Sequence, residues 1–535
     1  ELMLANPFTV YNGAATQKRI INPYFNMILR GSTNTKYGNF GLLYGGIEWK
    51  NLTMFTFGSN VGYNRYTLFE RNAWDPVGNI KNRYASYYYT GIINQDQRWG
   101  TQGFKGIMLN GWNMPFNTSV DLYYGKTQYL AGVVRQDTTM PSYNFGLKLS
   151  KALKNDSRIS LNTFSSTATS DSINSLRDVK WQVYTTEFSF NLIKGLNLSG
   201  ELGMGSYESP AYKQAWGEGI VADLNFEKSL TKIPFSLRYF QIGKYFTNNV
   251  ASFTNNSIRE VYDGYVQNPT AVILVPNAAG LMGPGGLANN QRGFGINTSF
   301  EVKKFKISLG NQFSSEMDTL ENGTQLSFSH RINGLQWGRL PLWFPNPGQL
   351  GPNGRIGTFY RGAYEIVKID DPALLNADSS AKFLRHFNGI DAQVKYKTKL
   401  FNKDLYINYL GSFQSAQKEF SPVTVFTPDA FIRAYYNELE AYYQLSRTLI
   451  VSTYVGYERI LGNSSTEVDP VTMLPRNQVG KALGFGCDFA ISSSTTVFFR
   501  HRWMSFEDKN FKAYHGPNPN DPGAVISRDA EAFKG

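Results

Sequence analysis

Cysteine is almost absent from this chain of 535 residues, because Cys487 is the only one. A single cysteine excludes a framework of internal disulfides and leaves the redox compartment open. No apolar run approaches the roughly eighteen residues that a membrane-spanning helix requires. The first residues also lack the charged, apolar and small-residue regions of a secretory leader, so we expect the leader of an exported protein to have been removed already.

Dense basic runs are missing as well, although the formal net charge is +12. Lysine and arginine are scattered along the chain, and we therefore expect no nucleic-acid partner. A basic surface of this kind equally suits anionic lipid headgroups or a lumen that attracts anions.

Motifs for catalysis and metal binding are lacking too. The four histidines, His330, His386, His501 and His515, are far apart in sequence, and no HExxH, CxxC or GxSxG motif occurs. The carboxylates of residues 369–380 are spaced loosely as in a calcium loop but lack the EF-hand pattern. We predict no enzyme, no metal site and no cofactor, although a Ser-His pair assembled across strands stays open.

Aromatic residues and glycine are abundant: there are 33 Tyr, 38 Phe and 50 Gly, a composition that favours extended chain over helix. In "TEFSFNLIKGLNLSGELGMG", residues 186–205, apolar and polar residues alternate on both sides of Lys194-Gly195. This period of two predicts an antiparallel hairpin with one apolar and one polar face.

The same pattern recurs along the chain and predicts roughly twenty strands. Hairpins are predicted at 38–62, 102–126, 142–167, 182–206, 215–246, 291–315, 323–343, 385–415, 430–459 and 479–506, with further strands near 20–32, 85–95 and 357–367. Many of these strands run to about ten residues, the length with which a tilted strand crosses a bilayer.

Short turns within hairpins alternate with longer connections rich in Gly, Pro, Asn and Asp, as in membrane barrels, where short turns and long loops lie at opposite rims. Because hydrocarbon tolerates only a closed sheet, the apolar face should contact lipid and the polar face should line the lumen. Aromatics near strand ends, including Trp112 and Phe116, agree with interfacial girdles. We predict an all-β fold, a large antiparallel transmembrane β-barrel of about 20–22 strands with short periplasmic turns and long extracellular loops.

These features resemble an outer-membrane β-barrel of a Gram-negative bacterium, from about residue 20 onward. The resemblance implies an integral protein of the cell outer membrane, in contact with lipid and lipopolysaccharide. We expect residues 1–20 to be a lead segment and residues 21–535 to be the barrel. The lead segment is too short for the plug domain of transporters driven from the inner membrane, and no energy-coupling box is recognisable.

The C-terminal region departs from that resemblance. Such barrels commonly finish on a strand with a terminal aromatic, whereas this chain has "EAFKG" after a polar loop from residue 507. Either a last strand is missing from this chain, or closure is achieved differently.

Charged residues on the polar face are the candidate site residues. In "TTVFFRHRWMSF", alternation places Arg500 and Arg502 on the lumen face, where they either attract anions or pair with carboxylates such as Asp488 on the neighbouring strand. Glu187 and Glu201 are further candidates for the lumen face, and the same two alternatives apply to them.

Two loops, 268–290 and 340–354, are long, apolar and rich in Gly and Pro. An apolar segment left in water is costly, so these loops should constrict the lumen, dip into lipid or bind another protein, the alternative being simple mobile loops. The candidate residues for a constriction or a partner contact are Val272, Ile273, Leu274, Val275, Leu281, Met282, Trp343 and Phe344.

Two functions follow from these predictions. The first is an outer-membrane channel or transporter that passes solutes through a polar lumen constricted by the long loops. The alternative is a non-catalytic barrel that serves as a subunit or scaffold of a larger outer-membrane complex for secretion, assembly or surface attachment, and holds other outer-membrane or surface proteins through its apolar loops. The fold alone does not decide between them.

Overall fold

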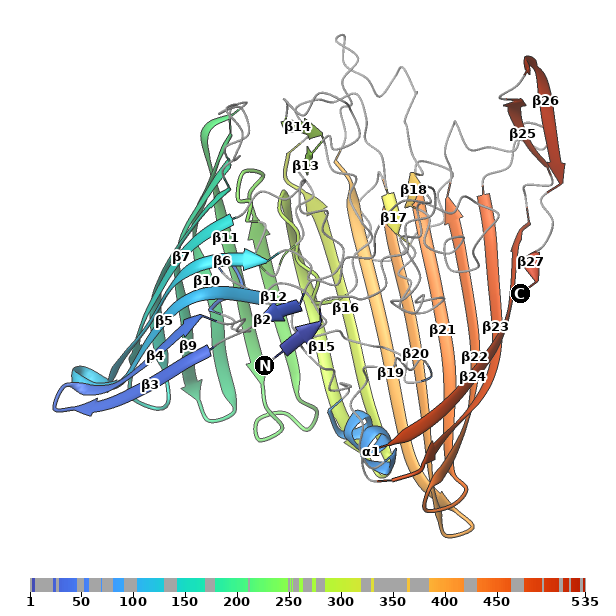
Figure 1. Cartoon of the computed structure of the whole chain (residues 1–535), viewed down its shortest axis with the longest axis horizontal. Coiled ribbons are helices and arrows are strands. Elements are labelled where there is room, and N and C mark those ends of the chain that lie inside the picture. Colours follow the sequence, from blue (N-terminus) through green and yellow to red (C-terminus); the bar gives the residue numbers. More distant parts are fainter. Residues whose placement is uncertain are drawn as a thin grey trace.

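A computed structural model shows a closed barrel built from antiparallel strands (Figure 1). The structure describes residues 2–4, 23–25, 28–45, 52–56, 69, 80–90, 103–128, 142–168, 179–209, 212–248, 251, 253, 259–262, 272–275, 284–318, 329–331, 363–365, 384–417, 431–462, 476–492, 495–509, 513–518, 521–529 and 533–534. Nineteen of the strands in these ranges form the ring.

Eighteen of these strands follow one another around the ring in chain order. They are β3 (Ile28–Thr35), β4 (Gly38–Gly45), β5 (Gly103–Met114), β6 (Thr118–Gln128), β7 (Ser142–Ala152), β8 (Arg158–Ala168), β9 (Val179–Ile193), β10 (Leu196–Ser209), β11 (Tyr212–Phe226), β12 (Phe235–Ile242), β15 (Gln291–Val302), β16 (Phe305–Glu316), β19 (His386–Leu400), β20 (Lys403–Gln417), β21 (Phe431–Gln444), β22 (Leu449–Gly462), β23 (Arg476–Ala490) and β24 (Thr496–Asp508). The nineteenth, β27 (Phe533–Lys534), stands between β24 and β3.

The remaining elements are small. The helices among the described residues are α1 (Ile80–Thr90) and the 3₁₀ turn η2 (Pro115–Asn117). Four two-stranded sheets pair β1 (Leu2–Leu4) with β2 (Pro23–Phe25), β13 (Arg259–Tyr262) with β14 (Val272–Val275), β17 (Ser329–Arg331) with β18 (Ala363–Glu365), and β25 (Ala513–Asn518) with β26 (Asp521–Asp529). No helix among the described residues has the length and apolar character needed to cross a membrane.

Eight of the ten predicted hairpins are confirmed. They are the pairs β5/β6, β7/β8, β9/β10, β11/β12, β15/β16, β19/β20, β21/β22 and β23/β24. Tight turns join several of them: at Phe401-Asn402 both residues have positive φ, 49° and 61°, the backbone that a two-residue turn needs to match strand twist. In the hairpin of residues 186–205, Gly195 has a φ of 86°, which glycine adopts without steric cost.

The apolar face points outward, as predicted. On β10, Leu202 exposes 47% of its surface while the preceding Glu201 exposes 3%. On β23, Phe485 exposes 45% while Asp488 exposes 0%. Side chains of successive strand residues point to opposite faces, so the exposed apolar series forms the outer wall and the polar series faces the interior.

Two sequence predictions in the N-terminal quarter are wrong. The predicted hairpin 38–62 does not form, because β4 pairs with the preceding β3 across the turn at Lys36-Tyr37, and the described residues 52–56 are not a strand. The strand predicted near 85–95 is contradicted by helix α1. Tyrosines that favour a strand in isolation are helical here because tertiary packing overrides intrinsic preference.

The hairpin predicted at 323–343 is described only in part. Its residues 329–331 form β17, which pairs with β18, close to the strand predicted near 357–367. Its remaining residues lie outside the described ranges, as do residues 369–380.

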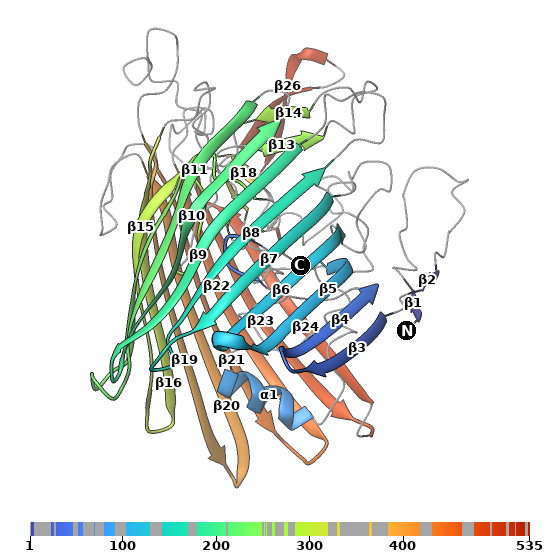
Figure 2. The ribbon, with the colours of Figure 1, turned by 90° about the vertical axis from the view of Figure 1, so that its left-hand side faces the viewer.

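Short turns lie at one rim and long connections at the other (Figures 1 and 2). The turns that close the eight hairpins form the lower, short-turn rim, together with the β3/β4 turn. The connections at the upper, long-loop rim are longer, except that only residues 210–211 separate β10 from β11. The predicted alternation of short and long connections is therefore confirmed with one exception.

The C-terminal region differs from the predicted polar loop. Residue 507 still belongs to β24, and β25 and β26 pair with each other beyond it. β27 pairs with β24 through Ser505 and Phe506, and it completes the ring next to β3. The ring is thus closed by a strand of two residues, whereas its other strands have 8 to 15.

Candidate functional site

The connection between β4 and β5 enters the barrel. Both ends of this connection are at the long-loop rim, because β4 runs away from its turn at Lys36-Tyr37 and β5 runs toward η2. Its described residues, 52–56, 69 and 80–90, contact the inner faces of barrel strands, as set out below. We call these residues the lumen segment.

Glu201 of β10 fixes the first part of the lumen segment. Its carboxylate accepts hydrogen bonds from the Thr53 hydroxyl (2.7 Å), the Phe55 backbone N–H (3.2 Å) and the Thr185 hydroxyl of β9 (2.5 Å). A buried carboxylate requires such donors, because burying it without them is strongly unfavourable. Residues 53–55 are therefore tied to the barrel wall.

The backbone of residues 52–56 is bound from two further sides. The Asn248 side chain donates to the carbonyl oxygens of Phe55 (2.9 Å) and Thr56 (2.7 Å). The Lys148 ammonium of β7 donates to the Leu52 carbonyl oxygen (3.1 Å). Buried backbone groups of an irregular segment are satisfied in this way by side chains in place of a sheet.

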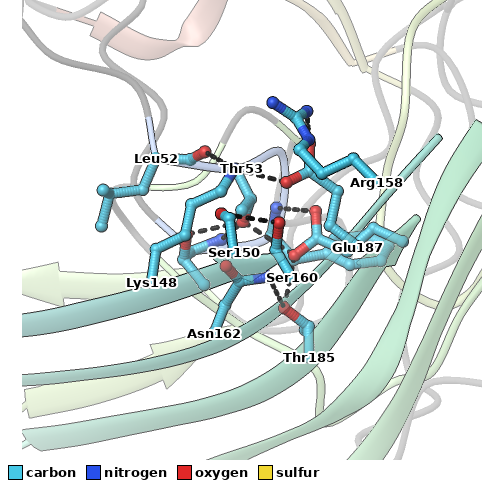
Figure 3. Close-up of polar contacts among 12 residues, drawn as sticks. Leu52, Thr53, Lys148, Ser150, Arg158, Ser160, Asn162, Thr185 and Glu187 are labelled. Atoms are coloured by element: carbon cyan, nitrogen blue, oxygen red, sulfur yellow. Dashed lines mark hydrogen bonds and ion pairs between the residues drawn. The ribbon is translucent and has the colours of Figure 1, made fainter. Parts of the chain in front are cut away.

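Neighbouring strands extend this polar network (Figure 3). Lys148 also forms an ion pair with Glu187 of β9, whose other oxygen lies 3.4 Å from Nη2 of Arg158 on β8. Beside them the Ser160 hydroxyl donates to the Ser150 hydroxyl at 2.8 Å. Lys148, Glu187 and Arg158 are thus paired with one another, while Glu201 is held by hydrogen-bond donors.

An apolar cluster accompanies the polar contacts on the same wall. Phe55 packs against Phe246 and Phe253, with ring centroids 4.9 Å and 6.0 Å apart. The cluster consists of Leu52, Phe55, Met108, Tyr123, Phe164, Val183, Val221, Phe240, Ile242, Phe246, Phe253 and Leu287. Burial of side chains of this size contributes about 1.5–3 kcal/mol each. This part of the interior is therefore a packed core and not an open polar lumen.

A second anchor lies on β23 and β24. The Tyr84 hydroxyl of α1 donates to the Asp488 carboxylate, and Nη2 of Arg500 is 2.9 Å from the other Asp488 oxygen. Arg500 also donates through Nε to the Phe69 carbonyl oxygen at 2.7 Å. Burial, and then the Asp488 charge, raise the pKa of Tyr84 above its usual 10.0, so its phenol remains a donor.

Glu440 of β21 supports the same anchor. Its carboxylate accepts hydrogen bonds from the Phe69 backbone N–H (3.1 Å) and the Tyr442 hydroxyl (2.7 Å). The ring of Tyr442 packs on Tyr84 with centroids 4.5 Å apart, and Phe69 packs on Tyr454 at 5.1 Å. Aromatic rings thus exclude water from the hydrogen bonds between the lumen segment and this wall.

Helix α1 reaches the short-turn rim. The Tyr88 hydroxyl donates to the carbonyl oxygen of Lys304, in the two-residue turn between β15 and β16, at 3.1 Å. Figures 1 and 2 both show α1 beside the lower turns. The lumen segment therefore passes from the long-loop rim, where its connection begins, to the short-turn rim.

The two anchors lie on opposite walls. β10, which carries Glu201, and β23, which carries Asp488, are nine places apart in a ring of nineteen strands. Because nine places are almost half of the ring, a segment bonded to both walls crosses the interior. The lumen segment thus spans the barrel in width as well as in height.

Four of the five predicted lumen-facing residues have described side chains. Glu187, Glu201, Asp488 and Arg500 each have the polar contacts given above, and Arg500 pairs with Asp488, the pairing that the sequence left open. Arg502 lies on β24, but its side chain is outside the described part of the structure. A functional role for these five residues stays a prediction.

The predicted constriction residues are largely outside the described ranges. Residues 272–275 form β14, whose side chains are not described, and Leu281, Met282, Trp343 and Phe344 lie outside those ranges altogether. The described end of the first loop, 284–290, does pack inward. Leu287 and Ala288 are buried there, and Gln312 of β16 donates to the Gly286 carbonyl oxygen at 2.6 Å.

The lumen segment was not predicted from the sequence. A usable signal was the spacing of Tyr84, Tyr87 and Tyr88, which places three tyrosines on one face of a helix. No comparable signal exists for Thr53 and Phe55, because their partners are more than a hundred residues away in sequence. Within the described ranges, no group of three or more His, Cys, Asp or Glu residues is arranged to hold a metal ion.

No protein-family model and no curated protein matches the chain. Among solved structures, the chain is similar to the copper transporter OprC, at 11% identity over 90% of this chain and 71% of that chain, with a TM-score of 0.32. It is also similar to a double mutant of the Serratia marcescens hemophore receptor HasR in complex with its hemophore HasA and heme, at 11% identity over 91% of this chain and 78% of that chain, with a TM-score of 0.30. Likeness at these TM-scores supports no conclusion about this chain.

The chain's own geometry identifies its architecture. A closed antiparallel ring satisfies the backbone without water, and an apolar outer face suits hydrocarbon. Long loops at one rim and short turns at the other complete the pattern of outer-membrane barrels. The predicted all-β antiparallel barrel is confirmed, although the ring of described strands has nineteen members where about 20–22 were predicted. The protein is an integral β-barrel of the outer-membrane type.

Proposed function

We propose that the protein is a channel or transporter of the Gram-negative outer membrane, and that the lumen segment gates the passage of solutes through the barrel. The outer face contacts lipid and lipopolysaccharide, and the short turns are periplasmic. The observation that carries the proposal is that the lumen segment crosses the interior, bonded to Glu201 on one wall and to Asp488 and Arg500 on the other.

The need for a gate follows from the size of the barrel. A ring of about this many strands encloses an interior wide enough for an aqueous channel. An open channel of that width would admit solutes without selection, whereas a barrel filled by its own chain excludes them. The sequence predicted a constriction by loops 268–290 and 340–354. To this we add the β4–β5 connection, which we take to be the main barrier.

The lumen segment is attached in a way that lets it leave the barrel wall without opening the sheet. In the part of the chain that the structure describes, residues 52–56, 69 and 80–90 contribute no strand to the barrel sheet and are held by side-chain contacts. Side-chain contacts break individually, at about 0.5–1.5 kcal/mol net for each neutral hydrogen bond. The sheet can therefore stay closed while the segment moves.

The test is a planar-bilayer recording of purified protein. Wild-type protein should conduct little, and a variant with residues 46–102 replaced by a short Gly-Ser linker should give steady steps of large conductance. A variant with residues 80–90 alone replaced by Gly-Ser residues should conduct at an intermediate level. If the linker variant folds into the bilayer and conducts no more than wild type, the lumen segment is not the gate.

A further inference from the structure

Three lysines lie together at the short-turn end of the barrel interior. Lys306 on β16 stands directly opposite Lys395 on β19 in the strand register, and Lys397 is the next residue along the same face of β19. Residues directly opposite on neighbouring strands have Cβ atoms about 4.5–5.5 Å apart. Like charges at such spacing repel, and a fold retains them at a cost in stability.

Helix α1 covers these lysines with the faces of its tyrosines. The Lys395 ammonium lies 5.3 Å from the ring centroid of Tyr87, and the Lys306 ammonium lies 5.2 Å from that of Tyr88. The Lys397 ammonium lies 5.6 Å from the ring centroid of Tyr89. Each contact is a cation–π interaction, which partly offsets the repulsion but brings no negative charge.

The C-terminal end of α1 adds a weaker compensation. The Lys395 ammonium donates to the Tyr87 carbonyl oxygen at 3.2 Å, and residue 87 is in the last turn of a helix that ends at Thr90. The last four carbonyl groups of a helix have no partner inside the helix and carry about half a negative charge in total. The helix end thus presents partial negative charge to Lys395.

Nearby carboxylates do not neutralise the group. Glu301 pairs with Lys306 at 2.5 Å, and its side chain is 64% exposed. Asp404 of β20 stands opposite Lys399, a fourth lysine on the same face of β19. Among the described residues, Glu301 and Asp404 are thus the carboxylates beside these four lysines, and the lysine group itself has a surplus of positive charge.

We propose that Lys306, Lys395 and Lys397 form a binding site for a small multivalent anion, a solute with two or more phosphate or carboxylate groups, and that α1 occupies this site while the barrel is closed. This inference rests on the proposed function and names the class of solute that passes. An anion with two or more charges pairs with several ammonium groups at once. A single tyrosine face or a single carbonyl group of α1 does not offer such a pairing. Anion and helix therefore compete for the same lysines.

Calorimetric titration of the full chain in detergent, at low ionic strength, tests the site with inorganic pyrophosphate as probe. Binding should weaken at least tenfold when Lys306, Lys395 and Lys397 are all changed to glutamine. The matched control changes Lys154, Lys228 and Lys232, exposed lysines of the short turns, to glutamine and should bind like wild type. Equal binding by the two triple variants, or no binding by wild type, overturns the proposal.

A second variant tests the competition and keeps all three lysines. Changing Tyr87, Tyr88 and Tyr89 to alanine should increase pyrophosphate affinity, because the helix no longer covers the ammonium groups. A decrease in affinity would show that the tyrosines hold the anion and would overturn the competition. A parallel titration with citrate distinguishes a carboxylate from a phosphate solute. Calorimetry detects binding whether or not the barrel conducts. If wild-type protein binds pyrophosphate but the variant with residues 46–102 replaced does not conduct, the proposed gate is contradicted and the anion site is not. If that variant conducts but wild-type protein does not bind pyrophosphate, the anion site is contradicted and the gate is not.

Discussion

Glu201 shows what a single residue contributes to the gate. It accepts three hydrogen bonds, two from the lumen segment and one from β9. In a Glu201→Gln variant the amide nitrogen accepts no hydrogen bond, so at least one buried donor is left unpaired at a cost of about 1–3 kcal/mol. We expect more frequent channel openings and faster proteolysis between β4 and β5.

The matched control is Glu227→Gln, in the exposed turn between β11 and β12, where the carboxylate accepts a hydrogen bond from the Ser229 hydroxyl at 3.4 Å. Channel openings and proteolysis of this control should equal those of wild type. A Glu201→Gln variant that behaves like the control would contradict the role given to this anchor.

Gly146 shows how closely the inner wall is packed. It stands opposite Tyr123 across β6 and β7, and a Cβ at position 146 would lie 2.1 Å from the tyrosine ring. A Gly146→Ala change forces the buried ring to move, at a cost of about 1–3 kcal/mol. The control is Gly31→Ala on β3, where a Cβ meets nothing within 4 Å.

The measurement is the temperature at which folded barrel, seen as the faster-migrating band on gels of unheated samples, is lost. Gly146→Ala should lower this temperature, while Gly31→Ala should leave it unchanged. Equal temperatures for the two variants would mean that Tyr123 has room to move.

At the scale of elements, the hairpins were predictable, whereas the lumen segment offered one local signal, the tyrosine spacing of α1, and none for residues 52–56. Alternation identifies a strand such as β10 because lipid and interior impose opposite polarities on neighbouring residues, as at Leu202 and Glu201. Helix α1 is stabilised by contacts with strands far away in sequence, such as Tyr84 with Asp488. The local sequence carries little information about such partners, and the tyrosines of α1, taken by their strand preference and not by their helical spacing, suggested a strand.

The docking of α1 should respond to alkaline pH through Tyr84. Its pKa is raised above 10.0 by burial, so the docked helix keeps the phenol protonated, whereas the released helix ionises near 10. The contribution of this group to docking is therefore full below pH 10 and is lost as pH rises beyond it. Bilayer conductance should be flat between pH 7 and 9 and rise above about pH 10.

A Tyr84→Phe variant is the matched test, because it keeps the ring on Tyr442 and removes the ionisable hydroxyl. Its conductance at pH 7 should be higher than that of wild type, since the buried Asp488 loses a donor, and the part of the alkaline rise due to Tyr84 should disappear. An identical alkaline rise in wild type and variant would assign the response to other groups.

For the whole molecule, the sequence predicted a membrane barrel with alternating short and long connections, and the structure agrees. It did not predict that the ring closes through the two residues of β27, because two residues carry no periodicity. Nor did it predict that the interior is filled in part by an apolar core around Phe55 and Phe246. Both features depend on contacts between segments distant in sequence.

The central claim is that lipid contacts the exposed apolar side chains and that the opposite face lines the interior. Spin labels test it in bilayers, at Leu202→Cys and Leu483→Cys on the outer face and at Ser199→Cys on the inner face, all with Cys487→Ser. Labels at 202 and 483 should collide with lipid-soluble oxygen and not with a water-soluble nickel complex, whereas the label at 199 should show little contact with oxygen. The reverse pattern, with the labels at 202 and 483 accessible only to the nickel complex, would contradict the account.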